Sequence, residues 1–207
     1  MVDWLNETAI TAFGTPTTRA ELLGFVTGLL NVWLLVRQHV ANWPVGIANV
    51  LLLMLVFTGA GLYADAGLQG VYVVLGLYGW WHWLRGGADH GPLVVRRTTR
   101  NEWLGQAVAG VVLTAALCYW LAGHTDSNTE LPDALTTALS LLATYGQTRK
   151  LLESWWLWIA ADLIYIPLYG YKDLWLTALL YTVFLGLCVA GLRAWRRAAV
   201  DRSPVPA

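Results

Sequence analysis

The fold of this chain is decided by the stretch RQHVANWPVGIANVLLLMLVFTGAGLYADAGLQGVYVVLGLYGWWHW (residues 37–83), which returns in a second version as RKLLESWWLWIAADLIYIPLYGYKDLWLTALLYTVFLGLCVAGLRAW (residues 149–195). A shift of 112 positions places Arg37 on Arg149, Trp43 on Trp155, Leu62 on Leu174, Tyr72 on Phe184, Gly79 on Gly191 and Trp83 on Trp195. The duplication indicates that both halves descend from one three-segment unit. Internally repeated membrane bundles are typical of small transporters, with the substrate site between the repeats near the bilayer midplane.

The composition places this duplicated chain in a membrane. Of its 207 residues, 57% are hydrophobic and only 13% are charged, against about 25% charged in a soluble domain. The net charge is zero, which argues against nucleic-acid binding. Cys118 and Cys188 both lie in apolar runs, where a small buried side chain is favoured over a disulfide or a metal ligand. The first residues carry Asp3 and Glu7 without a basic stretch, so we expect the first membrane helix, and not a cleavable signal peptide, to target the chain.

The hydrophobic pattern predicts an all-α integral membrane protein with seven transmembrane helices. The expected segments are 20–38, 42–60, 65–84, 104–122, 132–148, 155–170 and 174–195. Three crossings bring the chain to the opposite face of the bilayer, so a second copy keeps its orientation only if one extra helix intervenes. The sequence therefore predicts two parallel three-helix repeats, at 20–84 and 132–197, joined by an inverter helix at 104–122.

The basic residues predict the orientation in the membrane. With the N-terminus outside, the inner loops and the C-terminus hold Arg37, Arg85, Arg96, Arg97, Arg100, Arg149, Lys150, Arg193, Arg196, Arg197 and Arg202. Only Arg19 and Lys172 then lie outside. This strong positive-inside bias predicts an outer N-terminus and a cytoplasmic C-terminus.

Several short motifs occur in order along both halves of the chain. They are NWPVGIAN at 42–49, LYADAGLQ at 62–69, YGWWHW at 78–83, TRKLLESWWLWIAAD at 148–162 and the closing Gly191 and Trp195. With these motifs the chain resembles the PnuC family of vitamin transporters, and the resemblance covers roughly residues 20–197. It implies a fold similar to the SWEET sugar transporters, with 3+1+3 helices in the plasma (inner) membrane. It also implies uptake by facilitated diffusion, in which a cytoplasmic kinase phosphorylates the vitamin and so traps it. A homotrimer is compatible with the resemblance.

The resemblance implies nicotinamide riboside, a precursor for NAD biosynthesis, as the expected substrate. Related branches of the family carry riboflavin or thiamine. Nicotinamide riboside members often have an asparagine in the helix where this chain has Asp162. An acidic residue inside a membrane helix costs about 2.5–3.5 kcal/mol on insertion scales, so it is expected to face a polar cavity or a partner. Because nicotinamide riboside and thiamine carry a positive ring and riboflavin does not, Asp162 favours a cationic vitamin.

Aromatic and polar side chains recur along the same segment. Trp155, Trp158, Asp162, Tyr165 and Tyr169 follow one another at intervals of three or four and form one helical stripe. Flat rings would stack on the vitamin and polar groups would bind its hydroxyls. For Trp155 and Tyr169, near the ends of the segment, we expect an interfacial aromatic belt, and for Tyr145 and Tyr181 we expect packing between helices.

Polar residues at comparable depth occur in the other segments. Asn49 lies six residues after Trp43, and Asp162 six after Trp156, so we expect both to face one cavity. Gln69 and Tyr72 share a stripe with Gly76 and Trp80, and Gln147 shares one with Ser140 and Thr144. Interhelical hydrogen bonding, worth about 0.6 kcal/mol, is the alternative for both glutamines. The predicted substrate-binding residues are Asn49, Gln69, Tyr72, Gln147, Trp158, Asp162 and Tyr165.

Other functions find little support. The four histidines are scattered without metal-binding spacing, and no nucleotide-binding or nucleophile motif occurs, so we expect no catalytic residue, metal, cofactor or enzyme activity. An intramembrane enzyme would need a reactive partner for Asp162, and a receptor subunit would need no enclosed cavity. Pro44 and Pro167 are either static kinks or hinges for alternating access. The partners expected are the vitamin and the lipid bilayer.

Overall fold

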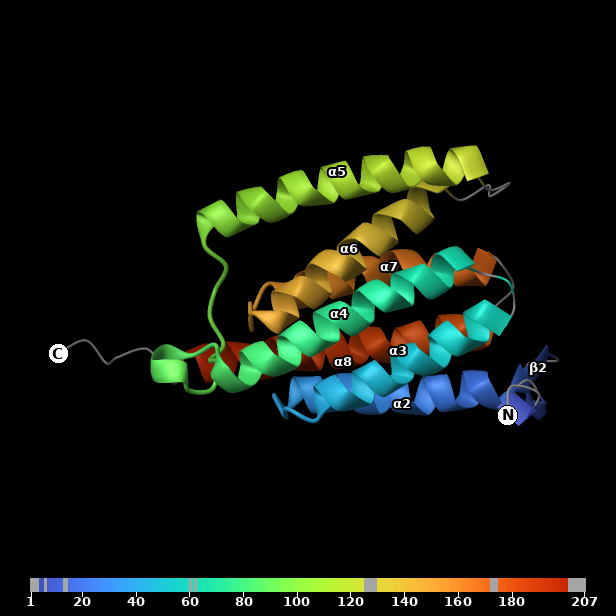
Figure 1. Ribbon diagram of the computed structural model, residues 1–207, viewed down its shortest axis with the longest axis horizontal. Helices are drawn as coiled ribbons and strands as arrows, with labels where there is room; N and C mark the ends of the chain where they lie inside the picture. Colours follow the sequence, from blue (N-terminus) through green and yellow to red (C-terminus); the bar gives the residue numbers. More distant parts are fainter. Residues whose placement is uncertain are drawn as a thin grey trace. The chain divides into compact units, whose positions relative to one another are not determined.

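The computed structural model describes residues 4–5, 7–12, 15–59, 61, 63–124, 130–171 and 175–200. Within this part of the chain seven long helices dominate (Figure 1). They are α2 (Arg19–Val36), α3 (Asn42–Gly59), α4 (Tyr63–Arg85), α5 (Arg100–His124), α6 (Glu130–Thr148), α7 (Ser154–Tyr171) and α8 (Trp175–Val200). The prediction of an all-α chain with seven helices is confirmed, and the bounds differ from the expected ones by a few residues.

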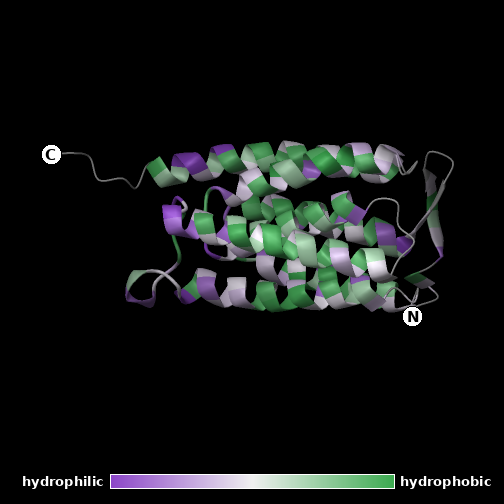
Figure 2. Ribbon diagram, turned by 90° about the horizontal axis from the view of Figure 1, so that it is seen from above, coloured by the Kyte–Doolittle hydropathy of each residue, from purple (hydrophilic) through white to green (hydrophobic). Residues whose placement is uncertain are grey.

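Four of these helices, α2, α3, α5 and α8, are long and apolar enough to cross a membrane on length and composition alone. The other three are α4, α6 and α7, which carry more polar or aromatic residues. Figure 2 shows hydrophobic residues along the lengths of the helices and hydrophilic ones mainly near their ends. Polar residues inside a membrane helix are tolerated where they face protein rather than lipid, so the weak apolar character of α6 agrees with its buried Thr136 and Ser140.

A small hairpin that the sequence did not reveal precedes the helices. Strand β1 (Thr8–Ala12) pairs antiparallel with β2 (Thr15–Thr18). Thr18 then caps α2, because its side chain accepts a hydrogen bond from the Glu21 amide and the Glu21 carboxylate accepts one from the Thr18 amide. Arg19 forms an ion pair of 2.7 Å with Glu7 of the hairpin segment. These contacts fix where the first helix begins.

The chain divides into two compact units, Met1–Leu93 and Val94–Ala207. In the first unit α2 packs on α3 and α3 on α4; in the second, α5 packs on α6, α6 on α7 and α7 on α8. The helix at 100–124 therefore belongs to the second compact unit. Its role as an inverter between separate repeats stays a prediction.

The two units repeat the same three-helix arrangement. Shifted by 112 positions, the bounds of α3 coincide with those of α7, and α4 and α8 begin at equivalent residues. In the first unit Trp43 meets Trp83 edge to face, with ring centroids 5.4 Å apart and an interplanar angle of 88°. In the second unit Trp155 meets Trp195 at 5.4 Å and 89°. Of the matched residues, Leu62 and Leu174 lie outside the described residues.

A glycine completes each tryptophan pair. A Cβ added to Gly191 would lie 2.5 Å from ring atoms of Trp155, and one added to Gly79 would collide with the ring of Trp43. Only glycine therefore allows the indole to lie against the neighbouring helix. Position 79 in α4 and position 191 in α8 are equivalent under the repeat, so this contact was duplicated as a unit.

The turns before α3 and α7 also match in detail. Gln38 and Lys150, which are equivalent, both have left-handed backbones, with φ of 54° and 50°. Asn42 Nδ2 donates to the carbonyl of His39 at 2.8 Å, and Ser154 Oγ donates to the carbonyl of Leu151 at 2.7 Å. Each turn thus uses a short polar side chain to satisfy the same carbonyl.

Candidate substrate site

The carboxyl group of Asp162 lies near the middle of α7 and is buried, with 1% of the residue exposed. The thiol of Cys188 on α8 donates to Asp162 Oδ2 at 3.4 Å, and Cys188 is itself 4% exposed. Both cysteines are free, as expected, but the polar contact of Cys188 was not foreseen. A lone cysteine in an apolar run gave no sequence signal for a hydrogen bond to a residue in another helix.

Aromatic rings surround this part of α7. Tyr165 lies 4.6 Å from Tyr181 of α8 between ring centroids and stacks on Tyr169 at 5.6 Å. Tyr169 also stacks on Tyr181 at 5.1 Å, and Tyr181 meets Phe184 edge to face. Tyr181 packs between helices, as expected. We call these four residues the tyrosine cluster.

On its other side, α7 faces the buried polar stripe of α6. The phenol of Tyr165 lies beside the hydroxyl groups of Thr136 and Ser140. Both of these residues are buried, and so is Gln147 farther along α6. The predicted residues Gln147, Asp162 and Tyr165 thus all belong to the interior of the second unit. The structure brings Asp162 and Tyr165 into one neighbourhood.

The two tryptophans of the predicted stripe differ. Trp155 is 0% exposed and packs against Gly191 and Trp195, so an interfacial position for it is wrong. Trp158 is half-buried, and the indole nitrogens of both residues are buried without a hydrogen bond to any described residue. A buried donor without a protein acceptor is a feature expected where a ligand or a water binds.

The predicted residues of the first unit form a separate group. Asn49 Nδ2 donates to the carbonyl of Gly24 at 2.9 Å and to Thr27 Oγ1 at 2.7 Å, both on α2. Gln69 is buried and Tyr72 is half-buried on α4. Asn49 therefore contacts the first helix of its repeat, whereas Asp162 contacts the last helix of its own. The expectation that Asn49 and Asp162 face one cavity stays a prediction.

Two surface hollows are found in the first unit, away from these residues. One, of about 480 Å³, is lined by Trp33, Leu34, Arg37 and His39. The other, of about 320 Å³, is lined by five residues of α4, namely Leu77, Trp80, Trp81, Leu84 and Arg85. Neither contains any of the seven predicted substrate-binding residues. Trp80, from the predicted α4 stripe, lines the second hollow.

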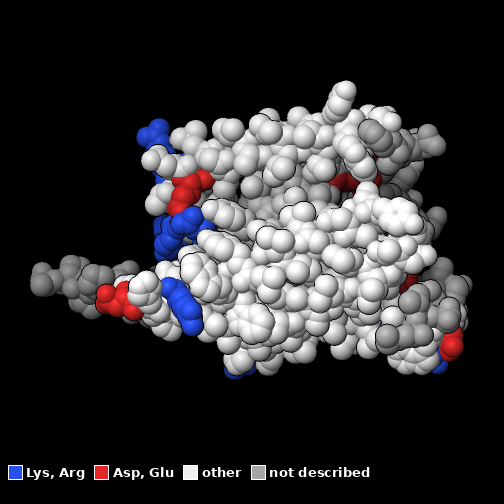
Figure 3. Space-filling model, viewed as in Figure 1, with Lys and Arg blue, Asp and Glu red and all other residues white. Residues whose placement is uncertain are grey.

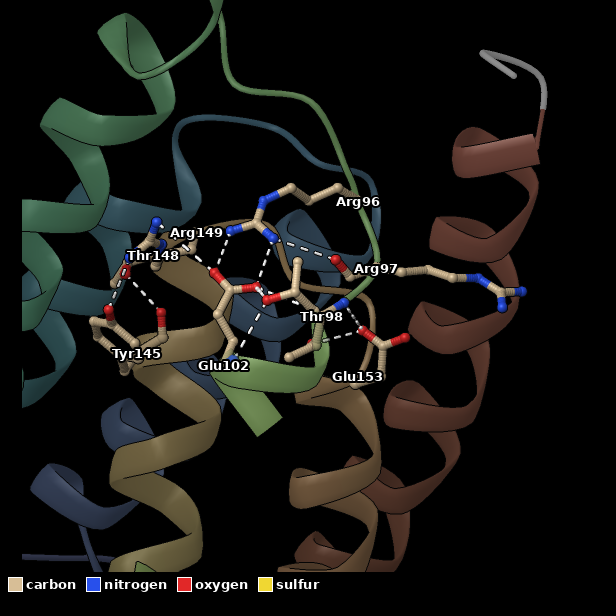
Figure 4. A network of polar contacts seen from close by, with 9 residues as sticks. Arg96, Arg97, Thr98, Glu102, Tyr145, Thr148, Arg149 and Glu153 are labelled. Carbon is tan, nitrogen blue, oxygen red and sulfur yellow. Dashed lines mark hydrogen bonds and ion pairs between the residues drawn. The ribbon is translucent and has the colours of Figure 1, made fainter. Parts of the chain in front are cut away.

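A polar network lies at the end of the second unit where α5 begins, and Figure 3 shows blue Lys and Arg atoms beside red Asp and Glu atoms there. The Arg96 guanidinium donates to both oxygens of Glu102, at 2.6 and 2.8 Å (Figure 4). This hydrogen bonding raises the pKa of Arg96 above its ordinary value. Arg149, from the turn between α6 and α7, lies 3.9 Å from the same carboxylate. Glu102 therefore joins the start of α5 to two basic residues.

The same network ties the segment before α5 to the turn before α7. The Arg96 amide donates to the Lys150 carbonyl at 3.1 Å, and the Leu152 amide donates to the Arg96 carbonyl at 2.9 Å. Thr98 donates from both its amide and its hydroxyl to Glu153 Oε2, each at 2.7 Å. We call residues 96–98 with these partners the connector strap. No motif or spacing in the sequence predicts these contacts.

Residues 18–197 match the family described as nicotinamide mononucleotide transporter, and the chain belongs to this family. It is 30% identical to the riboflavin/roseoflavin transporter RibM of Streptomyces davaonensis, over 99% of this chain and 97% of the relative. It is 26% identical to the nicotinamide riboside transporter PnuC of Escherichia coli, over 93% and 91%. The crystal structure of the vitamin B3 transporter PnuC is similar, with a TM-score of 0.68, 26% identity and coverage of 89% of this chain and 83% of that one.

These similarities confirm the resemblance to the PnuC family. The chain is a multi-pass inner-membrane transporter of that family, and its relatives are transporters and not enzymes. The two named substrates of the relatives differ in one property that matters for Asp162. The nicotinamide riboside ring is a cation, whereas the riboflavin ring is neutral.

Proposed function

We propose that this transporter imports nicotinamide riboside by facilitated diffusion, with its N-terminus outside and its C-terminus in the cytoplasm. The observation that supports the substrate is the buried carboxyl of Asp162. Its hydrogen-bond partner is a neutral thiol, and the ion pairs found among the described residues, Arg19–Glu7, Arg96–Glu102 and Arg149–Glu102, do not include it. A cationic ring would supply the missing positive charge.

The surrounding residues suit the rest of such a molecule. Trp158 offers a flat ring and a buried indole donor without a protein acceptor among the described residues, and stacking on an aromatic side chain is worth about 1–3 kcal/mol per base-like ring. Gln147 and Tyr165 in the second unit, and Asn49, Gln69 and Tyr72 in the first, offer donors and acceptors for ribose hydroxyls. Together with Asp162, these six residues are the proposed substrate contacts.

Trapping would complete the uptake. The sequence contains no nucleotide-binding motif, so we propose that a cytoplasmic kinase phosphorylates the vitamin and prevents its return, and that the import feeds NAD biosynthesis. The family resemblance that supports this scheme also makes a homotrimer the oligomer to test first.

Riboflavin is the second candidate substrate. It is favoured by the 30% identity to RibM along nearly the whole of both chains. A flavin ring can stack on Trp158 as well as a pyridinium can, but it offers no positive charge to Asp162. The two candidates therefore differ at one residue of the proposed site.

Uptake into proteoliposomes tests the proposal. The purified protein should equilibrate labelled nicotinamide riboside across the membrane, and an excess of unlabelled nicotinamide riboside should compete better than riboflavin or thiamine. Empty liposomes give the background. Uptake of labelled riboflavin with no uptake of nicotinamide riboside would replace the first candidate by the second.

A further inference from the structure

The larger of the two hollows of the first unit lies at the turn between α2 and α3. It has a volume of about 480 Å³ and is lined by Trp33, Leu34, Arg37 and His39. Helices α2 and α3 are both long and apolar enough to cross a membrane, and Arg37 is the first residue after α2. With both helices crossing the bilayer, this Arg37 hollow lies where the ends of the helices meet the lipid headgroups.

The second repeat shows what an arginine at this position binds. Under the shift of 112 positions, Trp33 and Arg37 correspond to Tyr145 and Arg149. Each guanidinium lies over the ring of the preceding helical turn, at 5.2 Å in the first repeat and 5.9 Å in the second. Arg149 also lies 3.9 Å from the carboxylate of Glu102 on α5. The ion pairs found among the described residues do not include Arg37, so within this part of the chain the first repeat has the arginine and the ring without the carboxylate.

His39 adds a second hydrogen-bond donor to the Arg37 hollow. Its Nδ1 accepts a hydrogen bond from the Ala41 amide at 3.2 Å, so the proton of the neutral ring lies on Nε2. Both Arg37 and His39 are exposed, and both line the hollow. An arginine binds phosphate through two parallel hydrogen bonds, and an imidazole N–H can donate to a further phosphate oxygen. The Arg37 hollow therefore has the donors that a phosphate group needs.

An exposed apolar stripe of α2 leads to this hollow. Val26, Leu30 and Trp33 follow one another at intervals of three or four, so they share one face of the helix, and Arg37 continues the spacing. The exposed fractions of the three apolar residues are 56%, 43% and 46%. An acyl chain can lie along such a face, whereas a free phosphate ion makes no contact with it. The combination of stripe and hollow therefore favours a phosphate that carries acyl chains.

We infer that the Arg37 hollow binds the headgroup of an anionic phospholipid, with the lipid phosphate on Arg37 and His39 and an acyl chain along the apolar stripe of α2. Basic pockets at the ends of membrane helices are suited to such headgroups. The lipid phosphate takes the place that the Glu102 carboxylate has in the second repeat. This site goes beyond the proposed function, since it depends neither on which vitamin is carried nor on the direction of transport.

Lipid titration of the purified full chain in detergent tests the site. Phosphatidylglycerol should raise the midpoint of thermal unfolding in a saturable way, because a ligand that binds the folded state stabilises it. Phosphatidylcholine with the same acyl chains, which has no net charge, and inorganic phosphate should leave the midpoint unchanged. Equal stabilisation by phosphatidylcholine would show that only the acyl chains bind. Equal stabilisation by inorganic phosphate would show a site for a free anion, and either result would overturn the inference.

Variants locate the lipid on the protein. Arg37→Gln should weaken the affinity for phosphatidylglycerol about tenfold or more, because hydrogen bonds to a charged group are lost. Arg37→Lys keeps the positive charge and should lose less. Arg193→Gln, at an exposed arginine of α8, removes the same charge elsewhere and should bind the lipid like the parent. If Arg37→Gln does not fold, the comparison of the two lipids on the parent and on Arg37→Lys still decides.

Native mass spectrometry counts the lipids that each variant retains and gives its oligomeric state. We expect the parent to retain phosphatidylglycerol and Arg37→Gln to lose it without a change in oligomeric state. Parent-like retention by Arg37→Gln, or an equal loss in Arg193→Gln, would overturn the inference. A changed oligomeric state with unchanged lipid retention would also overturn it, because the Arg37 hollow would then be an interface between copies of the chain.

Discussion

In the first repeat Trp43 lies against Gly79 and meets Trp83; in the second, Trp155 lies against Gly191 and meets Trp195 in the same geometry. The polar residues of α3 and α7 diverge instead, since Asn49 contacts α2 and Asp162 contacts α8. An added Cβ at either glycine would collide with the indole, and this constraint is the same in both copies. A buried polar group needs a hydrogen-bond partner, but that partner can come from different helices. The two copies use different ones.

Removing the buried indoles should have the largest effect on stability, and the effect should be similar in both repeats. Trp43→Ala and Trp155→Ala each leave a cavity between two helices, and Trp→Ala changes in cores cost about 3–5 kcal/mol. Thermal unfolding in detergent should show a strong loss of stability for both. Trp156→Ala, at a residue 46% exposed, is the control. A large loss in only one repeat would contradict the equivalence of the two packing units.

Replacing the glycine by alanine tests the same contact between glycine and indole by adding one methyl group. Gly79→Ala and Gly191→Ala should each cost about 1–3 kcal/mol, because the Cβ meets an indole that has no space to move. Gly186→Ala and Gly67→Ala are matched controls, since an added Cβ there meets nothing within 4 Å. The measurement is again the midpoint of thermal unfolding. Equal midpoints for Gly191→Ala and Gly186→Ala would show that the helices separate easily.

The polar difference between the repeats should appear in substrate selectivity. Asp162→Asn should weaken the binding of nicotinamide riboside by about 1.5–3 kcal/mol, the range for hydrogen bonds to charged groups, and should leave riboflavin binding nearly unchanged. Asn49→Ala removes a neutral amide and should not change the preference between the two vitamins. Competition binding to the purified protein measures both. Parent-like binding of nicotinamide riboside by Asp162→Asn would exclude Asp162 from the site.

The Arg96–Glu102 ion pair, next to the connector strap, should give the smallest effect. The strap's acceptor Glu153 has no acidic counterpart in the first repeat, which has Ala41 at that position. Glu102→Gln should cost about 0.2–1 kcal/mol, as expected for a partly exposed ion pair, and the loss should shrink in high salt. Glu7→Gln, in the exposed pair with Arg19, is the control and should cost less. A loss independent of salt would mean that shape rather than charge holds the strap.

The helices, the repeat and the recurrence of its tryptophans and glycines at equivalent positions could all be predicted from the sequence. Apolar runs of membrane length and a constant shift of 112 positions are local or one-dimensional properties, so they can be read without knowing which faces meet. The stripe of α7 was also correctly placed in a helix. Its periodicity did not reveal that Trp155 is fully buried against Gly191 whereas Trp158 is half-buried, although the indole nitrogens of both lack a partner among the described residues.

The polar partners depend on how the helices pack against one another. Cys188 and Asp162 are 26 residues apart, Asn49 and Gly24 are 25 apart, and Thr98 and Glu153 are 55 apart. A hydrogen bond depends on a few tenths of an ångström and on the rotation of each helix about its axis, and neither follows from composition or periodicity. The contact between Asp162 and the Cys188 thiol therefore forms only when α7 packs on α8. In the same way, Thr98 reaches Glu153 only through the tertiary fold.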